Sequence, residues 1–166
     1  MTNDINNKIS NELNSILSDK SKLPSKNLID NITHLKSLYL NKKRYFHVLS
    51  GLESDYRFIK KTKLLADGFG KIVLQNKKKQ KYVHVTPNIK SLQTSKNEKF
   101  LRYHETNAGG DLHSDGPQLS TPPRYVFLAC IKNSAKGGDN IIVDCKRIYS
   151  DMKKNERALL KTLNSN

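Results

Sequence analysis

The sequence has no long apolar run and few cysteines. No stretch approaches the ~20 consecutive apolar residues that cross a bilayer. The first residues, MTNDINNKISNELNSILSDK, lack the basic segment followed by an apolar one that marks a secretory signal. The two cysteines, Cys130 and Cys145, form neither a metal-binding spacing nor a disulfide framework, so we expect free thiols in the core. These absences predict a cytoplasmic protein with no membrane partner.

Acidic residues are scarce relative to basic ones. The 166 residues contain 30 Lys and Arg but 15 Asp and Glu, which gives a net charge of +15. Such a charge favours nucleic acid, anionic membranes or small anionic substrates through long-range attraction. The simpler interpretation is a solvated surface, because the basic residues are spread along the whole chain without the spacing of a recognition motif. A basic nucleic-acid-binding protein without catalysis stays the alternative, although nucleic acid is not the partner we expect.

The length suits one domain, and no internal repeat or linker divides it. Residues 1–22 are rich in Asn, Ser, Asp and Lys and predict a flexible or weakly helical lead-in. Residues 23–166 then form the domain. From Ser25 onward one apolar stripe with helical spacing follows, made of Leu28, Ile32, Leu35 and Tyr39. His34 lies off this stripe, and we expect it at the surface.

A second helix is expected after Ser54, which is a possible N-cap. Its apolar face would contain Phe58, Leu65 and Phe69, and its end would be set by Gly68 and Gly70. After Asp144 the chain turns helical again, and Asn155 is a plausible N-cap for the last helix.

Between the helices, the alternation of apolar and polar residues predicts strands. They are expected at residues 44–52, 71–75, 82–87, 124–132 and 140–144. The last two are apolar almost throughout, so we expect them to be buried. His47 falls on an apolar face of the first strand, which favours a packed histidine over a metal ligand.

The chemistry concentrates at residues 105–125, ETNAGGDLHSDGPQLSTPPRY. On an extended segment, side chains two positions apart point to the same side. His113 and Asp115 can therefore converge on one cation, and with one more histidine they would form the two-His, one-carboxylate set that binds Fe(II). The neighbouring Gly109, Gly110 and Gly116 would let the backbone turn sharply. A pattern as short as His-x-Asp is weak support for a metal site by itself.

The longer stretch LHSDGPQLSTPPRYVFLACIKNSAKGGDNIIVDCKRIYSDM resembles the taurine dioxygenase-like (TauD/TfdA) family of Fe(II)- and 2-oxoglutarate-dependent oxygenases. The shared features are His-x-Asp before Gly-Pro, Pro-Pro before an apolar strand, a Gly-Gly-Asp turn, a strand ending in Asp, and a helix. The dense likeness runs from near Tyr103 to near Met152. A looser one includes YFHVLSGL and LLADGFGKI upstream.

The resemblance implies roles for particular residues. His113 and Asp115 are similar to the family's first two iron ligands. Asn140 falls where many members carry a Thr that contacts 2-oxoglutarate, and an Asn amide can also donate to a carboxylate, although Asn140 could equally just begin a strand. Three residues before the pair lie where members often contact substrate: His104, Thr106 and Asn107.

The resemblance also implies an α+β fold with a double-stranded β-helix, or jelly-roll, core and flanking helices. That core has eight strands, and this chain accounts for its N-terminal part only. The family's third ligand is a later histidine, followed by an Arg that pairs with 2-oxoglutarate, but no histidine follows Asp115 here. We therefore expect an incomplete core and site.

Three explanations stay open for the missing part. The chain is the N-terminal part of a longer oxygenase, one half of a split enzyme whose second polypeptide supplies His and Arg, or an inactive remnant. The implied function is oxidation of a C–H bond in a small anionic or zwitterionic substrate. Substrates of relatives include sulfonates, betaines and amino acids.

Overall fold

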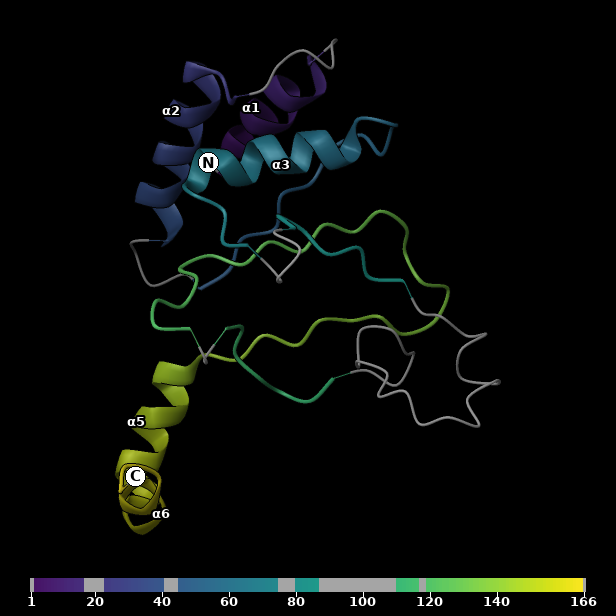
Figure 1. The fold of residues 1–166 in the computed structure, drawn as a ribbon. Helices are drawn as coiled ribbons and strands as arrows, with labels where there is room; N and C mark the ends of the chain where they lie inside the picture. The colour runs from purple at the N-terminus through teal and green to yellow at the C-terminus, as the bar shows by residue number, and fades with distance from the viewer. Residues whose placement is uncertain are drawn as a thin grey trace, which may run out of the picture.

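The computed structural model describes residues 2–16, 23–40, 45–74, 80–86, 110–116 and 119–165. Its helices are α1 (Thr2–Asn14), α2 (Lys26–Leu35), a π-helical turn η1 (Lys36–Leu40), α3 (Phe58–Phe69), α5 (Cys145–Asn155) and α6 (Arg157–Leu163). Helices α1, α2 and α3 form one layer, with irregular segments beneath it (Figure 1). The pair α5 and α6 projects from the opposite side (Figure 1).

Helix α1 belongs to the core, which differs from the expected flexible or weakly helical lead-in at residues 1–22. Its residues Ile5, Ile9 and Leu13 have exposed fractions of 2%, 0% and 0%. They recur every four positions and therefore share one face of the helix. The many Asn and Ser residues hide this pattern in the sequence, and packing against α2 and α3 outweighs their weak helix propensity.

Helix α2 begins where the sequence predicts. The Ser25 hydroxyl accepts a hydrogen bond from the Leu28 amide at 3.0 Å, which is an N-cap contact. The stripe Leu28, Ile32 and Leu35 is buried against α1 and α3. His34 is exposed, as expected. The Tyr39 side chain lies outside the described residues.

Helix α3 begins later than predicted, because Ser54 is not its N-cap. The N-cap position is Arg57, and the Asp55 carboxylate accepts a hydrogen bond from the Arg57 amide at 2.9 Å. Phe58 and Leu65 are buried as expected. Gly70, with φ 145°, ends the helix, whereas Gly68 lies inside it, where a Cβ would clash with Ile32 Cδ1 of α2. Gly68 therefore serves the close approach of two helices.

The polar face of α1 binds the backbone of residues 48–53. Asn6 donates to the Val48 carbonyl at 3.3 Å, Ser10 to the Ser50 carbonyl at 2.6 Å, and Asn14 to the Gly51 carbonyl at 2.9 Å. The three donors recur every four positions, like the buried face beside them. Their side chains take hydrogen-bonding positions that a neighbouring strand would otherwise occupy.

None of the described residues lies in a β-strand, so the five expected strands are irregular wherever the structure describes them. The jelly-roll core stays a prediction. The expected burial of residues 124–132 and 140–144 is wrong for this chain, since Leu128 is 76% exposed and Ile141 is 78% exposed. An apolar strand is buried only where a second layer covers it, and the described part of the chain supplies no such layer.

Helix α5 is capped by Asp144, whose carboxylate accepts from the amides of Lys146 and Arg147 at 2.9 and 3.4 Å. Asn155 is the last residue of α5 rather than the cap of α6, which follows Glu156. Neither helix has a buried residue, and within the described chain α5 packs against α6 alone among the helices. Cys130 and Cys145 are free thiols as expected but are exposed, not in the core. No described helix has the length and apolar character needed to span a membrane.

Candidate metal centre

His113 and Asp115 lie together on the loop of residues 110–116. The atoms His113 Nε2 and Asp115 Oδ1 are 3.5 Å apart. The two side chains are 49% and 48% exposed, so the pair faces solvent. The structure thus brings the two predicted ligands onto one side of the loop.

A hydrogen bond orients the imidazole of His113. Its Nδ1 lies 2.6 Å from the Asp111 carbonyl oxygen. Because a carbonyl only accepts, Nδ1 carries the proton and Nε2 is the atom directed toward Asp115. Histidines that bind metals commonly use one ring nitrogen for the metal and give the other to a carbonyl or carboxylate.

Gly116 shapes the turn that follows Asp115. Its φ is 66°, in the left-handed region that favours glycine, and the Leu119 amide donates to its carbonyl at 3.0 Å. A Cβ at this position would lie 3.0 Å from both Leu119 Cδ1 and Pro123 Cδ. The sharp turn expected from the sequence is therefore present, and it closes against Pro123. Gly109 lies outside the described residues.

The pair fits a metal ion as two ligands. Two bonds of about 2.1 Å each span up to about 4.2 Å, which exceeds the 3.5 Å between His113 Nε2 and Asp115 Oδ1. Within the described residues, no group of three or more His, Cys, Asp or Glu side chains is placed to hold a metal, so no third ligand of these types joins the pair there. His47, 2.6 Å from the Asn6 side-chain oxygen, is half-buried as expected for a packed histidine.

The other predicted site residues are Asn140 and the three substrate contacts. Asn140 is exposed and follows Gly137 and Gly138, whose φ angles are 71° and 83°. The predicted substrate contacts His104, Thr106 and Asn107 lie outside the described residues.

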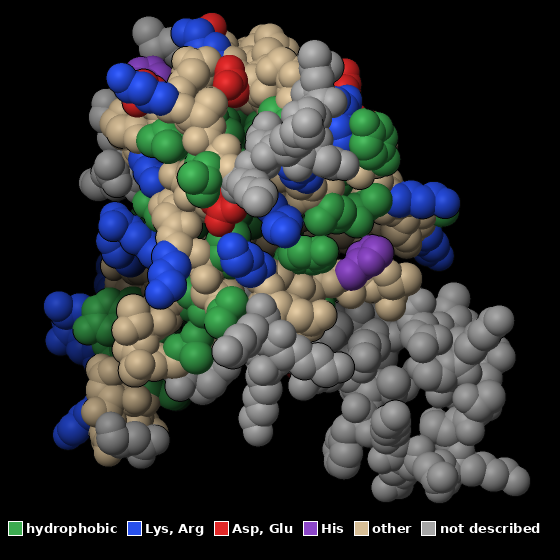
Figure 2. Space-filling view, turned by 45° about the horizontal axis from the view of Figure 1, so that its top comes forward, with side chains coloured by type: hydrophobic (Ala, Val, Ile, Leu, Met, Phe, Trp, Pro, Cys, Tyr) green, Lys and Arg blue, Asp and Glu red, His purple; other side chains and the backbone are tan. Residues whose placement is uncertain are grey.

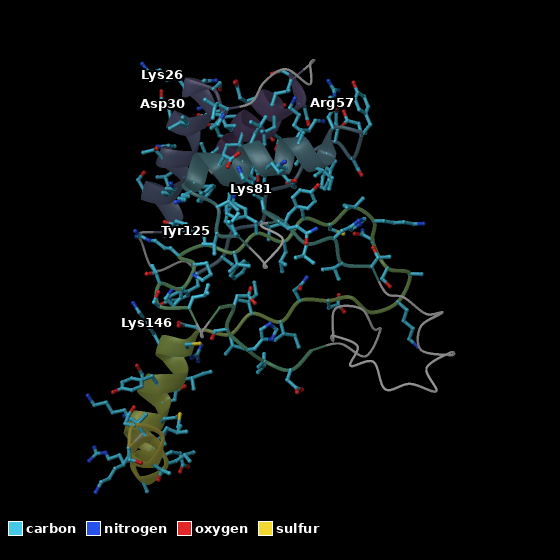
Figure 3. All side chains as sticks on the ribbon, viewed as in Figure 1. Lys26, Asp30, Arg57, Lys81, Tyr125 and Lys146 are labelled. Atoms are coloured by element: carbon cyan, nitrogen blue, oxygen red, sulfur yellow. The ribbon has the colours of Figure 1, made fainter. Side chains whose placement is uncertain are left out.

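Sequence reasoning missed a cluster that joins the segment after the pair to the helical layer. Phe69 at the end of α3 packs its ring edge-to-face against Tyr125 and Phe127. Lys36 lies over the rings of Phe69 and Tyr125, and burial, followed by the nearby charge of Arg124, lowers the Lys36 pKa. Figure 3 shows Tyr125 beneath the helical layer. The apolar face of α3 gave a signal for Phe69, but no spacing pointed to Lys36.

A second missed contact joins residues 45 and 144. Burial raises the Tyr45 pKa, and the charge of Asp144 and a hydrogen bond to it act in the same direction. Asp144 thus caps α5 and also binds a tyrosine from the segment that α1 holds. The contact brings Tyr45 beside the start of α5.

Comparisons with curated proteins and with solved structures give no match. The model of the family described as "Taurine catabolism dioxygenase TauD, TfdA family" matches residues 20–166, a span that includes the His113–Asp115 pair and leaves out α1. Because this family model matches most of the chain's length, the chain belongs to the TauD, TfdA family of dioxygenases.

Proposed function

We propose that the chain provides the His-x-Asp half of the iron site of an Fe(II)- and 2-oxoglutarate-dependent dioxygenase. The observation that carries this proposal is the orientation of His113, whose Nδ1–H is bound by the Asp111 carbonyl while Nε2 faces Asp115. Family membership supports the dioxygenase class.

Each residue of the site has a separate task. His113 and Asp115 hold Fe(II), and Asn140 donates its amide to a carboxylate of 2-oxoglutarate. The bound iron and 2-oxoglutarate would supply the chemistry by which O₂ oxidises a C–H bond of the substrate. The chain's own side chains bind and orient the metal, 2-oxoglutarate and the substrate. His104, Thr106 and Asn107 are the proposed substrate contacts.

The substrate is proposed to be small and anionic or zwitterionic. The support is the net charge of +15, which attracts anions over long range. Lys and Arg side chains are distributed over the face shown in Figure 2, with few Asp and Glu among them. We expect the protein to act in the cytoplasm.

The rest of the site is proposed to come from outside this sequence. No histidine follows Asp115 here, so a second polypeptide or a C-terminal half would supply the third ligand and the Arg that binds 2-oxoglutarate. The exposed apolar residues Leu128 and Ile141 support this, because a covering layer would bury them. We expect no turnover from the chain alone.

An anaerobic Fe(II) titration, with and without 2-oxoglutarate, tests the metal site. The chain should bind Fe(II) weakly, and His113→Ala or Asp115→Ala should weaken binding about tenfold or more. His34→Ala is the matched control, since His34 is an exposed histidine on α2. Equal affinity in the wild type and His113→Ala would contradict the proposal.

Nucleic-acid binding is the second candidate, favoured by the net charge alone. The spread of basic side chains over the visible face in Figure 2 gives no single stripe. Gel-shift experiments with random duplex DNA at rising salt separate the two. We expect weak binding that is lost by about 0.2 M salt, whereas sequence-selective binding that survives this salt would favour the second candidate.

A further inference from the structure

One aromatic cluster connects the helical layer to the segment that follows the His113–Asp115 pair. The ring of Phe69 lies 5.2 Å from that of Tyr125 and 4.9 Å from that of Phe127, measured between centroids. The interplanar angles of 70° and 76° are edge-to-face, the arrangement that aromatic quadrupoles favour. Phe69 also packs against the hydrophobic core. One side chain therefore contacts the core, Tyr125 and Phe127.

Lys36 fixes the end of α3 on which Phe69 lies. Its Nζ donates a hydrogen bond to the Phe69 carbonyl at 3.1 Å. A cation there satisfies a terminal helix carbonyl and suits the negative end of the helix dipole. The same Nζ lies 4.9 Å from the Phe69 ring centroid and 5.8 Å from that of Tyr125, so it attracts both rings.

The far end of the same segment is also held. The Ser54 hydroxyl donates to the Ile131 carbonyl at 3.3 Å, a contact between residues far apart in sequence. Leu128, between the two attachments, is 76% exposed. Residues 125–131 are thus attached at one end to Phe69 of α3 and at the other to Ser54 in the loop before α3, rather than by burial along their length.

The Gly116 turn lies between the His113–Asp115 pair and the Tyr125 contact with Phe69. Asp115 precedes the Gly116 turn, whose tight side is formed by Leu119 and Pro123. Pro123 stands two residues before Tyr125. A displacement of Tyr125 would therefore change the packing of the turn on which Asp115 depends.

We propose that Phe69, with Lys36 and Tyr125, is a positioning anchor for the His113–Asp115 pair. The anchor acts through the packing of Pro123 and Leu119 against Gly116 and does not touch the metal. Its role in metal binding rests on the proposed function, whereas its effect on the orientation of the pair does not.

The test uses the full chain labelled with ¹⁵N-histidine. Ring nitrogen shifts in NMR report which nitrogen of His113 carries the proton, and His113→Gln identifies the signal. The wild type should show the Nδ1–H form that the Asp111 carbonyl selects. In Phe69→Ala, the ring nitrogen shifts of His113 should move toward those of a mixture of both tautomers, as expected for an imidazole that no hydrogen bond orients. Fe(II) binding should weaken about tenfold.

Three further variants separate positioning from loss of the fold. Phe69→Leu keeps apolar volume in the core but removes the ring, so it should behave like Phe69→Ala. Phe69→Tyr keeps the ring and should behave like the wild type. Lys36→Met keeps the aliphatic stem and should give a smaller shift even if Phe69→Ala does not fold. Tyr149→Ala, at a half-exposed tyrosine on α5, is the control.

The outcomes distinguish this inference from the proposed function. If Phe69→Leu and Lys36→Met keep the wild-type His113 signal and helical circular dichroism, the anchor is refuted. If the wild type itself lacks the Nδ1–H form, the anchor is refuted too. If the signal shifts in both variants while no form of the chain binds Fe(II), the anchor stands and the proposed metal site fails.

Discussion

At the scale of single residues, the feature least visible in the sequence is a fully buried lysine. Lys61 of α3 is 0% exposed, and its Nζ donates to Asn14 Oδ1 at 3.1 Å and Asp55 Oδ2 at 3.2 Å. A buried cation is costly unless a carboxylate and further hydrogen bonds compensate it. Asp55 also pairs with Arg57 at 2.7 Å. The loop before α3 is thus held to α1 and α3 by charged contacts.

We predict that Asp55→Ala destabilises the chain more than Lys61→Met does. The first change removes the closer of the two carboxylates beside buried Lys61 and leaves only that of Glu53, which is 3.5 Å away and 64% exposed. The second change replaces the cation with an apolar side chain of similar length. Urea unfolding followed by circular dichroism measures both. A larger loss of unfolding free energy in Lys61→Met would show that the Lys61 contacts are net stabilising.

The same network predicts a dependence on acid. Burial alone would raise the Asp55 pKa, but hydrogen bonds from Arg57 and Lys61 outweigh it and place that pKa below the usual 3.8. A lowered carboxyl pKa stabilises the fold above 3.8, and this contribution is lost as pH falls below 3.8 through the folded value. The free energy of unfolding should therefore decrease as the pH is lowered below about 4. Asp55→Asn should show a shallower fall, and an unchanged slope would contradict this.

At the scale of elements, α1 is the helix whose importance the sequence conceals. It lies outside the residues 20–166 that match the family, yet it contributes Ile5, Ile9 and Leu13 to the core. The polar residues on its other face also recur every four positions, at Asn6, Ser10 and Asn14. These two repeats, one apolar and one polar, could have identified the helix from the sequence. A flexible lead-in that packs against nothing has no need of either repeat.

We predict that Ile9→Ala lowers the free energy of unfolding by about 2–5 kcal/mol, the range for a large-to-small change in a core. Ile9 is 0% exposed and packed among α1, α2 and α3. Lys8→Ala is the matched control, since Lys8 is exposed and its ion pair with Asp4 lies at the surface. Chemical denaturation measures both, and equal effects would mean that α1 is not part of the folded core.

At the scale of the whole molecule, burial is unevenly distributed. Every described buried apolar residue lies between Ile5 and Leu65, whereas the apolar residues of 124–165 are exposed or half-buried. Helices α1–α3 enclose the buried residues, with the irregular segments beneath them (Figure 1). Apolar side chains of those segments, such as Leu128 and Ile141, are exposed. The family match includes this exposed part.

We predict that Leu128→Asp changes the free energy of unfolding by less than about 0.5 kcal/mol, as surface substitutions do. Leu64→Asp, at a residue only 4% exposed, should unfold the chain. Thermal unfolding of the two variants compares them directly. Severe destabilisation by Leu128→Asp would mean that residues 124–131 are covered in solution, as the expected jelly roll requires.

Local spacing let the sequence determine the start of α2 at Ser25, its buried stripe, and the family through the residues around His113 and Asp115. These features depend on residues within a few positions of one another, so they are visible without a structure. Only the tertiary structure decided that α1 is buried, that Lys61 is enclosed, and that Phe69 holds Tyr125. Those contacts join residues tens of positions apart, such as Lys61 with Asn14 and Phe69 with Tyr125, and no local pattern specifies which distant partner completes a buried charge or ring.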